Sequence, residues 1–368
     1  MELDSDYVRK WYPQNDSITT IAGNGMPGSS GDGGLAVNAS IEVALALCAN
    51  GSNDALFWNT GVSGLRKIGG SNQIISTLAG NGSFAYTTDS LHADSSGLSM
   101  LDITCTADGI MFFSDFANNR VRKLDTTHII STLAGNGFLG FSGDGGPATS
   151  ADIGSPYGIT HDGEGNVYFS ANNRIRRVDT AGIITTVIGS GASGYNGDNI
   201  PAVSASLDSP GLMCMLSDSI LGFVDANNGL LRSVNLNTGI INSFCGQVGQ
   251  FGFAGDGGPA NAAITNGVFG MVADSSGNIY FADRNNNRIR KINGPSWALT
   301  GTPTCSDIGQ HPITIGVTNG IDTVYQSFTI TVQDTVAPTL TCPTNQTTYT
   351  TDTPVSYTHL TLPTTSRV

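Results

Sequence analysis

Short β-branched runs recur along the chain at a nearly constant interval. The runs begin at Ile18, Ile75, Ile130, Ile184 and Ile241, so successive starts are 57, 55, 54 and 57 residues apart. Isoleucine, valine and threonine favour extended strands because their branched side chains pack well on a pleated surface. A fixed period of this length indicates a tandem repeat in which each copy forms one small structural unit.

The third copy separates into four short strands. We predict strands over 157–160, 166–170, 174–178 and 183–188, with HDGEG joining the first pair and DTAG the last pair. Both connections have the composition of tight hairpin turns. Four strands per repeat, in tandem, predict an all-β fold of the β-propeller type in which each repeat forms a blade.

Glycine-rich sequences follow the β-branched runs. One of them, GNGFLG at 135–140, matches the G-x-G-x-x-G fingerprint of dinucleotide sites. Related sequences occur at 23–28, 80–85 and 189–194. A nucleotide site needs one such loop opening a long helix within a βαβ unit, and no long helix is predicted here. We therefore interpret these glycines as sharp turns between blades.

Charge and hydropathy exclude several classes of partner. The net charge is −13, and eleven of the twelve arginines fall in or beside one repeated strand instead of forming a basic patch, so no nucleic-acid partner is expected. No apolar run reaches the roughly 18–20 residues that cross a bilayer. The N-terminal MELDSDYVRKWYPQ has no signal-peptide pattern. N-x-S/T sequons favour a secreted protein over an intracellular one. They occur at Asn15, Asn38, Asn50, Asn81 and Asn345.

The strand sequences also carry a family resemblance. GNVYFSANNRIRRVD, GIMFFSDFANNRVRKLD and GNIYFADRNNNRIRKIN, joined through AGNGFLGFSGDGGPA, resemble the NHL repeat in its longer, glycine-rich variety. That variety is seen in secreted and cell-surface proteins, and teneurins are similar in carrying such a propeller. The resemblance covers about residues 6–293 and implies an NHL-type β-propeller of roughly six blades.

Five repeats and one partial blade are visible in the chain. Asp6–Tyr12 resembles the third strand of a preceding blade whose first half is absent. We expect a six-bladed ring that lacks upstream sequence, and a five-bladed ring with overlapping terminal strands is the alternative. The innermost strands are expected to start near Val43, Leu101, Tyr157, Leu212 and Val268.

The composition changes after the propeller, which we predict over residues 1–294. Residues 295–333 resemble part of a cadherin-like immunoglobulin module, and residues 334–354 resemble the start of a hyaline-repeat module. Both imply partial β-sandwich segments of an extracellular adhesion protein. Residues 355–368 include VSYTHLTLPT, which resembles a translated sequencing adaptor, so we exclude this segment from the fold.

Six cysteines could form three disulfides, but their positions favour another interpretation. Cys48, Cys105 and Cys214 occupy nearly equivalent places in the predicted innermost strands, and Cys245 lies in an outer strand. Equivalent positions in different blades are expected to be too far apart to bridge. We predict free, buried thiols in the propeller, while Cys305 and Cys342 fall in the partial modules.

An up-and-down chain path brings the long glycine-rich loops and the turns between second and third strands to one side, which we call the loop face. The expected binding residues are seven aspartates of this face together with His161 near the channel mouth. The aspartates are Asp32, Asp144, Asp198, Asp256, Asp115, Asp225 and Asp283. The structural interpretation is that Asp-Gly-Gly forms a turn, Pro147 or Pro259 starts a short helix, and the aspartate caps it. Asn-Asn-Arg turns are expected to hold through side-chain to backbone hydrogen bonds. The functional alternative is a ligand or calcium site, which requires six to eight converging oxygens.

The residue chemistry favours binding over catalysis. No catalytic residue is assigned, because His92, His128 and His161 lie at different positions of their repeats and do not form the set of three ligands typical of catalytic zinc. We predict a non-catalytic extracellular binding or adhesion scaffold for a protein or glycan partner, by analogy with the fold. The alternative is a metal-dependent hydrolase or lyase with a site in the central funnel.

Overall fold

The computed structural model describes residues 6–12, 15–60, 64–294, 309–318 and 323–332. The chain divides into two compact units, residues 1–294 and 295–368. In the second unit, β24 (Gly309–Thr318) pairs antiparallel with β25 (Thr323–Val332). The rest of the expected cadherin-like module, the hyaline-repeat start and the adaptor-like segment lie outside the described residues, and these assignments stay predictions.

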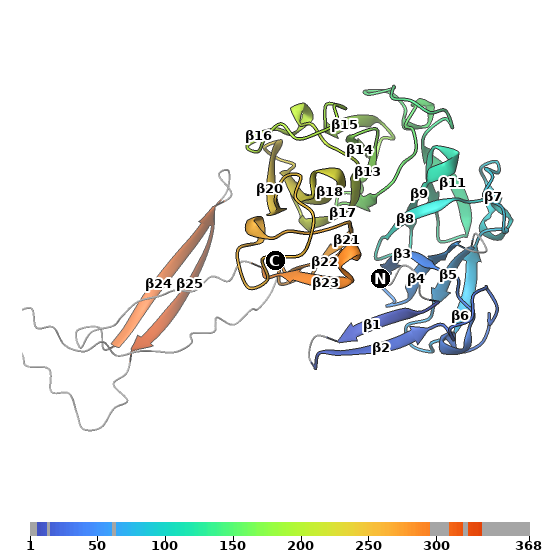
Figure 1. Cartoon of the computed structure of the whole chain (residues 1–368), viewed down its shortest axis with the longest axis horizontal. Coiled ribbons are helices and arrows are strands. Elements are labelled where there is room, and N and C mark those ends of the chain that lie inside the picture. Colours follow the sequence, from blue (N-terminus) through green and yellow to red (C-terminus); the bar gives the residue numbers. More distant parts are fainter. Residues whose placement is uncertain (1–5, 13–14, 61–63, 295–308, 319–322, 333–368) are drawn as a thin grey trace, which may run out of the picture. The chain divides into compact units, whose positions relative to one another are not determined.

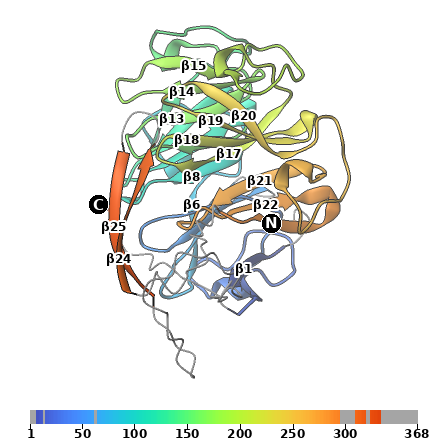
Figure 2. The same ribbon diagram turned by 90° about the vertical axis from the view of Figure 1, so that its left-hand side faces the viewer.

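The first unit consists of antiparallel sheets that follow one another in chain order (Figure 1), and Figure 2 shows them turned by 90°. Each sheet runs from an innermost to an outermost strand. The first blade contains β3 (Ala44–Ala49), β4 (Ala55–Asn59), β5 (Gly64–Ile68) and β6 (Ile75–Ala79). The second contains β8 (Met100–Cys105), β9 (Met111–Asp115), β10 (Arg120–Leu124) and β11 (Ile129–Ala134), with β7 (Leu91–His92) on its outer edge.

The remaining blades repeat this order. The third contains β12 (Ile159–His161), β13 (Val167–Ala171), β14 (Arg174–Val178) and β15 (Ile184–Ile188). The fourth contains β17 (Pro210–Ser217), β18 (Ile220–Asp225), β19 (Leu230–Asn235) and β20 (Ile240–Gly246), with β16 (Ile200–Pro201) outside it. The fifth has three strands, β21 (Val268–Ala273), β22 (Ile279–Asp283) and β23 (Arg288–Ile292). The prediction of an all-β propeller with five innermost strands is therefore confirmed.

The N-terminal hairpin of β1 (Val8–Tyr12) and β2 (Ser17–Ala22) has the register of a third and fourth strand. Its pairing shifts by one residue between Val8 and Arg9, and β10 shifts in the same way between Val121 and Arg122. Arg9 therefore stands where the other blades carry their repeated arginine. The partial blade expected from the sequence is present as this hairpin, and a sixth complete blade stays a prediction.

The hydrophobic core lies between consecutive sheets. Each of the five clusters of buried side chains joins neighbours in the ring: Val8 with Phe57, Trp58 with Phe113, Val121 with Phe169, Ile175 with Phe223, and Val224 with Phe281. Full burial of one such side chain stabilises the fold by about 1.5–3 kcal/mol. Blades therefore stabilise one another, and one flank is incompletely covered. Ile289 in β23 is 62% exposed, while its counterpart Ile175 in β14 is fully buried.

The glycines of GNGFLG form a sharp turn, as the sequence predicts. Gly135 has φ +93°, and a Cβ there would collide with the carbonyl oxygen of Asn119 on the neighbouring turn. The helix that follows in this loop, Ala148–Ser150, is a single 3-10 turn. The loop thus lacks the long helix on which a dinucleotide site depends.

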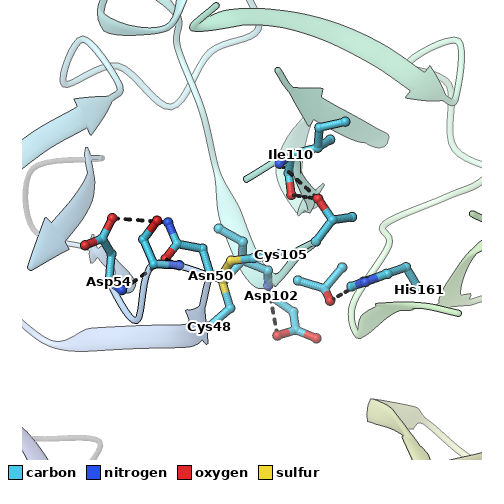
Figure 3. The surroundings of a disulfide bond; sticks show 11 residues. Cys48, Asn50, Asp54, Asp102, Cys105, Ile110 and His161 are labelled. Carbon is cyan, nitrogen blue, oxygen red and sulfur yellow. Dashed lines mark hydrogen bonds between the residues drawn. A yellow bond between two sulfur atoms is a disulfide. The ribbon is translucent and has the colours of Figure 1, made fainter. Parts of the chain in front are cut away.

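A disulfide between Cys48 and Cys105 shows that the prediction of free thiols was wrong for this pair (Figure 3). The two cysteines lie on β3 and β8, the innermost strands of neighbouring blades, and their Cα atoms are 6.0 Å apart. This separation falls within the range that a disulfide requires. The estimate from blade spacing failed because blades converge toward the axis of the ring. Cys214 and Cys245 are free, as predicted.

The same geometry recurs without a disulfide between β17 and β21. Cys214 pairs with Gly222 as Cys48 pairs with Leu56, and Ala273 takes the register position of Cys105 in its own blade. We expect Ala273→Cys to form a second interblade disulfide with Cys214 and to raise the free energy of unfolding by about 2–3 kcal/mol. Non-reducing mass analysis and thermal melts with and without reductant measure both effects.

Ala273→Ser is the matched control, because it makes a similar change without a thiol. Reductant should lower the melting temperature of oxidised Ala273→Cys further than that of Ala273→Ser, which has the Cys48–Cys105 bridge but not the added one. One more titratable thiol in Ala273→Cys than in Ala273→Ser, instead of one fewer, would contradict the proposed register.

Candidate functional site

The loop face is built from the connections 23–43, 80–99, 135–158, 189–209 and 247–267, together with the turns between second and third strands. The aspartates predicted on the long loops do not converge on one point. Each forms an ion pair with the repeated arginine of its own blade: Asp32 with Arg66 at 2.6 Å, Asp144 with Arg176 at 2.6 Å, Asp198 with Arg232 at 3.1 Å, and Asp256 with Arg290 at 2.6 Å.

The turn aspartates are directed inward to the same arginines. Asp115, Asp225 and Asp283 are fully buried, and each lies 3.3–3.5 Å from the guanidinium of Arg122, Arg232 or Arg290. Burial raises the pKa of Asp115 and Asp225 above the ordinary value, although hydrogen bonds and the arginine offset part of this effect. These carboxylates are therefore held inside their blades by the arginines.

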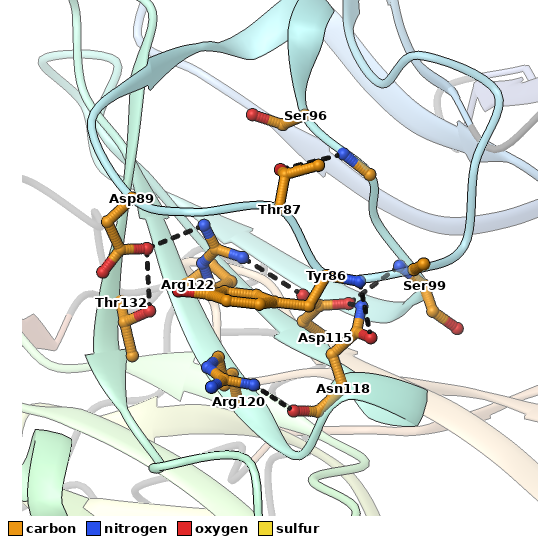
Figure 4. Close-up of polar contacts among 12 residues, drawn as sticks. Tyr86, Thr87, Asp89, Ser96, Ser99, Asp115, Asn118, Arg120, Arg122 and Thr132 are labelled. Carbon is orange, nitrogen blue, oxygen red and sulfur yellow. Dashed lines mark hydrogen bonds and ion pairs between the residues drawn. The ribbon is translucent and has the colours of Figure 1, made fainter.

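The second blade shows the arrangement in detail (Figure 4). Arg122 bridges two carboxylates: Nη1 lies 3.4 Å from Asp115, and Nη2 lies 2.9 Å from Asp89. Asp89 also accepts a hydrogen bond from Thr132 on β11 at 2.9 Å. The ring of Tyr86 lies against two guanidinium groups, with its centroid 3.7 Å from Arg120 and 5.0 Å from Arg122. Asp89 was absent from the predicted set, and its loop lacks the Gly-Asp pair that the other four loops share.

The repeated arginine also anchors the backbone of the long loop. Arg176 donates hydrogen bonds to the carbonyls of Ser142 at 2.8 Å and Asp152 at 3.2 Å, at two separate points of its loop. Burial acts to raise the pKa of Asp144, but hydrogen bonds from Thr186 and the ion pair with Arg176 outweigh it and lower the pKa. The long loops are thus held by one buried guanidinium each.

The predicted helix cap is wrong. The 3-10 turn Ala148–Ser150 has Pro147 as its N-cap residue, and no side chain caps it. Asp144 faces Arg176 instead. The predicted side-chain to backbone bonds of the asparagine turns are present, but they reach the long loop: Asn118 donates to Phe84, Asn172 to Gly140, Asn228 to Gly194, and Asn286 to Gly252.

His161 lies at the opposite end of its strand from the long loops. It closes β12 just before the turn to β13, and its Nδ1 is 2.8 Å from Thr104 Oγ1 on the neighbouring innermost strand (Figure 3). Burial lowers the pKa of His161 below its ordinary value. His161 therefore shares no site with the loop-face aspartates. In the described ranges, no cluster of three or more His, Cys, Asp or Glu side chains could hold a metal ion.

Large apolar side chains lie at the loop tips, within the segments that resemble the G-x-G-x-x-G motif. Phe138 is 70% exposed and Leu139 is 74% exposed. Their turn is fixed because Asn136 Oδ1 accepts a hydrogen bond from the backbone N–H of Phe138 at 2.9 Å. Corresponding loops expose Met26, Phe84 and Phe251. The signal in the sequence was an apolar pair within an otherwise polar, glycine-rich turn.

A pocket of about 450 Å³ opens on the loop face at the start of the innermost strands β12, β17 and β21. Tyr157 lies between two other rings, 6.4 Å from the centroid of Phe116 and 6.4 Å from that of Phe269, both nearly edge-on. Polar side chains and Arg284 complete its wall. Sequence reasoning missed this pocket because its residues come from several blades.

The geometry defines an NHL-type β-propeller whose loop face carries a pocket and exposed apolar tips. A family model described as "Teneurin NHL domain" matches residues 140–196. The chain is 42% identical to Teneurin-4 of Mus musculus over 95 residues, which is 22% of this chain and 3% of that protein. It is 31% identical to Teneurin-1 of Gallus gallus over 189 residues, 47% of this chain and 7% of that protein. Teneurins are therefore distant homologues, and the chain spans a small part of their length.

A solved structure shares the fold at low sequence identity. A chain in the crystal structure of a nidogen/laminin complex superposes with a TM-score of 0.52 and 12% identity, covering 79% of this chain and 87% of that chain. At this identity the likeness concerns the fold alone. Within the described residues, no helix has the length and apolar character to span a membrane.

Proposed function

We propose that this chain is part of an extracellular protein whose propeller binds a protein or glycan partner without catalysis, through the loop face. The observation that carries the proposal is that charged and apolar side chains have different roles on that face. The aspartates that could have formed a polar catalytic or metal centre are paired with buried arginines, whereas apolar side chains are presented to solvent on fixed turns. Exposed apolar groups on a rigid scaffold are typical of interaction surfaces.

Two observations support the extracellular location. The Cys48–Cys105 disulfide fits an oxidising compartment, since cytosolic thiols are normally kept reduced. The matched family model describes a teneurin domain. Adhesion as the biological role is part of the same proposal. No contact among the described residues favours the alternative of a metal-dependent hydrolase or lyase.

The test uses the full chain, secreted with its disulfide, against an array of cell-surface ectodomains and glycans. We expect saturable binding without turnover of the bound molecule. Replacing the tips in a Phe138→Ser, Leu139→Ser, Phe251→Ser variant should weaken binding of the identified protein partner at least tenfold, because exposed aromatic anchors dominate such interfaces. Surface plasmon resonance measures the affinity.

Ile18→Ser is the matched control, because Ile18 is also an exposed apolar side chain but lies in the N-terminal hairpin. It should leave binding unchanged. Equal loss in both variants would indicate non-specific adhesion of apolar surface and would contradict the proposal. Chemical conversion of a bound molecule by the full chain would favour the enzyme alternative.

A further inference from the structure

The pocket on the loop face combines apolar rings with polar groups that can pair with hydroxyls. Tyr157 and Phe269 are half-buried, and Phe116 is exposed, so the pocket has aromatic walls that are open to a ligand. Aromatic faces carry a partial negative charge and attract the slightly positive C–H groups of a sugar ring. The volume of 450 Å³ lies within the roughly 300–1,000 Å³ range of small-molecule sites.

The polar groups of the pocket supply both a donor and an acceptor. Asn173 Oδ1 accepts a hydrogen bond from the backbone N–H of Ser209 at 3.1 Å, which directs its NH₂ group away from that bond. Asn285 donates through Nδ2 to Asn266 at 3.1 Å, which leaves its Oδ1 as an acceptor. A hydroxyl both donates and accepts, so this pair of amides matches a polyhydroxylated ring.

Arg284 is the cation of this wall. In the five blades, the arginines of the repeated strand position form ion pairs with carboxylates, as Arg122 does with Asp115 and Asp89. In the part of the chain that the structure describes, Arg284 forms no ion pair with a carboxylate, and its guanidinium lies 5.6 Å from the Phe269 ring centroid. An exposed guanidinium beside an aromatic wall matches a carboxylate attached to a ring, because it can bind both oxygens.

From these three features we infer that the pocket binds a carboxylated sugar, such as a uronic acid residue of a glycan. The ring packs on Tyr157 and Phe269, the amides of Asn173 and Asn285 bind hydroxyls, and Arg284 binds the carboxylate. This inference rests on the proposed binding function and assigns a ligand class to one part of the loop face. The loop tips and the pocket are separate contacts, so each can fail alone.

The test is a titration of the full chain with methyl β-D-glucuronide, followed by ligand-observed NMR. The neutral methyl β-D-glucoside, which has the same ring with CH₂OH in place of the carboxylate, and acetate, which has the carboxylate without the ring, are the matched ligands. We expect the glucuronide to bind at least fivefold more tightly than either. Arg284→Gln should reduce the affinity for the glucuronide at least fivefold and leave the affinity for the glucoside unchanged.

Lys10→Gln is the control variant, because it removes the same unit charge from an exposed side chain on β1. It should not change the affinity for the glucuronide, and circular dichroism should show all variants folded. Equal affinity for glucuronide and glucoside, or an Arg284→Gln variant that binds like the parent, would overturn the inference. The loop-tip variant should keep glucuronide binding. If the protein partner binds and the glucuronide does not, only the sugar site is refuted.

Discussion

Replacing Arg122 with methionine should destabilise the propeller by about 3–5 kcal/mol, the cost of removing one partner from a buried ion pair. Arg122 is fully buried, and it is the cation that lies between Asp115 and Asp89. Methionine fills a similar volume but leaves the buried Asp115 carboxylate without its counter-charge. The loop 80–99 should also loosen, because Asp89 loses its anchor to the third strand. Thermal melts and protease sensitivity of this loop measure the two effects.

Arg120→Met is the matched control for this prediction. Arg120 contacts the same Tyr86 ring but is partly exposed and donates to the carbonyls of Asn118 and Asn136. We expect it to cost about 1 kcal/mol, the range of ordinary hydrogen bonds. Adding Asp115→Asn to Arg122→Met should recover part of the loss, since the uncompensated charge is then removed. Equal destabilisation by Arg120→Met and Arg122→Met would contradict the role assigned to the buried charge.

The ion pairs of the long loops correspond to a regular spacing of aspartate and arginine in the sequence. Each repeated arginine follows its long-loop aspartate by 32–34 residues: Asp32 and Arg66, Asp89 and Arg122, Asp144 and Arg176, Asp198 and Arg232, and Asp256 and Arg290. A nearly constant separation of opposite charges in every repeat is a signal that the sequence contains. A comparison of aspartates across blades does not reveal this signal, because each aspartate pairs within its own blade.

Strands and repeats were predictable because their signals are local. The β-branched runs and hairpin turns lie within a few residues of one another, and even the partial blade at β1 was recognisable from its strand sequence. The disulfide and the pocket depend on how far apart blades stand at the axis, which no local pattern encodes. Cys48 and Cys105 are 57 residues apart, and their 6.0 Å approach follows from the convergence of innermost strands.

Asp102 lies at that convergence and should make stability depend on pH. It is a buried carboxylate on β8 that accepts hydrogen bonds from the backbone N–H groups of Ile103 at 2.9 Å and Ile159 at 2.8 Å. The second bond joins it to β12 of the next blade. Among the residues that the structure describes, no arginine or lysine forms an ion pair with it, and burial raises its pKa from 3.8 to about 7. The corresponding position of β17 carries Leu212, so a charge is not required by the repeat.

The sign of the effect follows from proton linkage. Because the pKa of Asp102 is raised on folding, the folded state binds its proton more tightly than the unfolded state between about pH 4 and 7. Stability from this group is present at low pH and is lost as the pH rises through 7. Between pH 5 and 8 the loss should be about 2–3 kcal/mol, since one pKa unit corresponds to about 1.4 kcal/mol. His161 works in the opposite direction, because its pKa is lowered and protonation at low pH opposes folding.

Asp102→Asn should therefore abolish this loss. Asparagine keeps a carbonyl oxygen that can accept the hydrogen bond from the Ile159 N–H, but it does not titrate. Any pH-independent cost of the altered Ile103 contact cancels, because each protein is compared with itself at two pH values. We expect the variant to gain about 2–3 kcal/mol relative to the parent on going from pH 5 to 8. Urea unfolding at both pH values, with both proteins in a His161→Gln background, isolates Asp102. Parallel pH profiles for the two proteins would show that Asp102 is ionised in the folded state well below neutral pH and would refute the assignment.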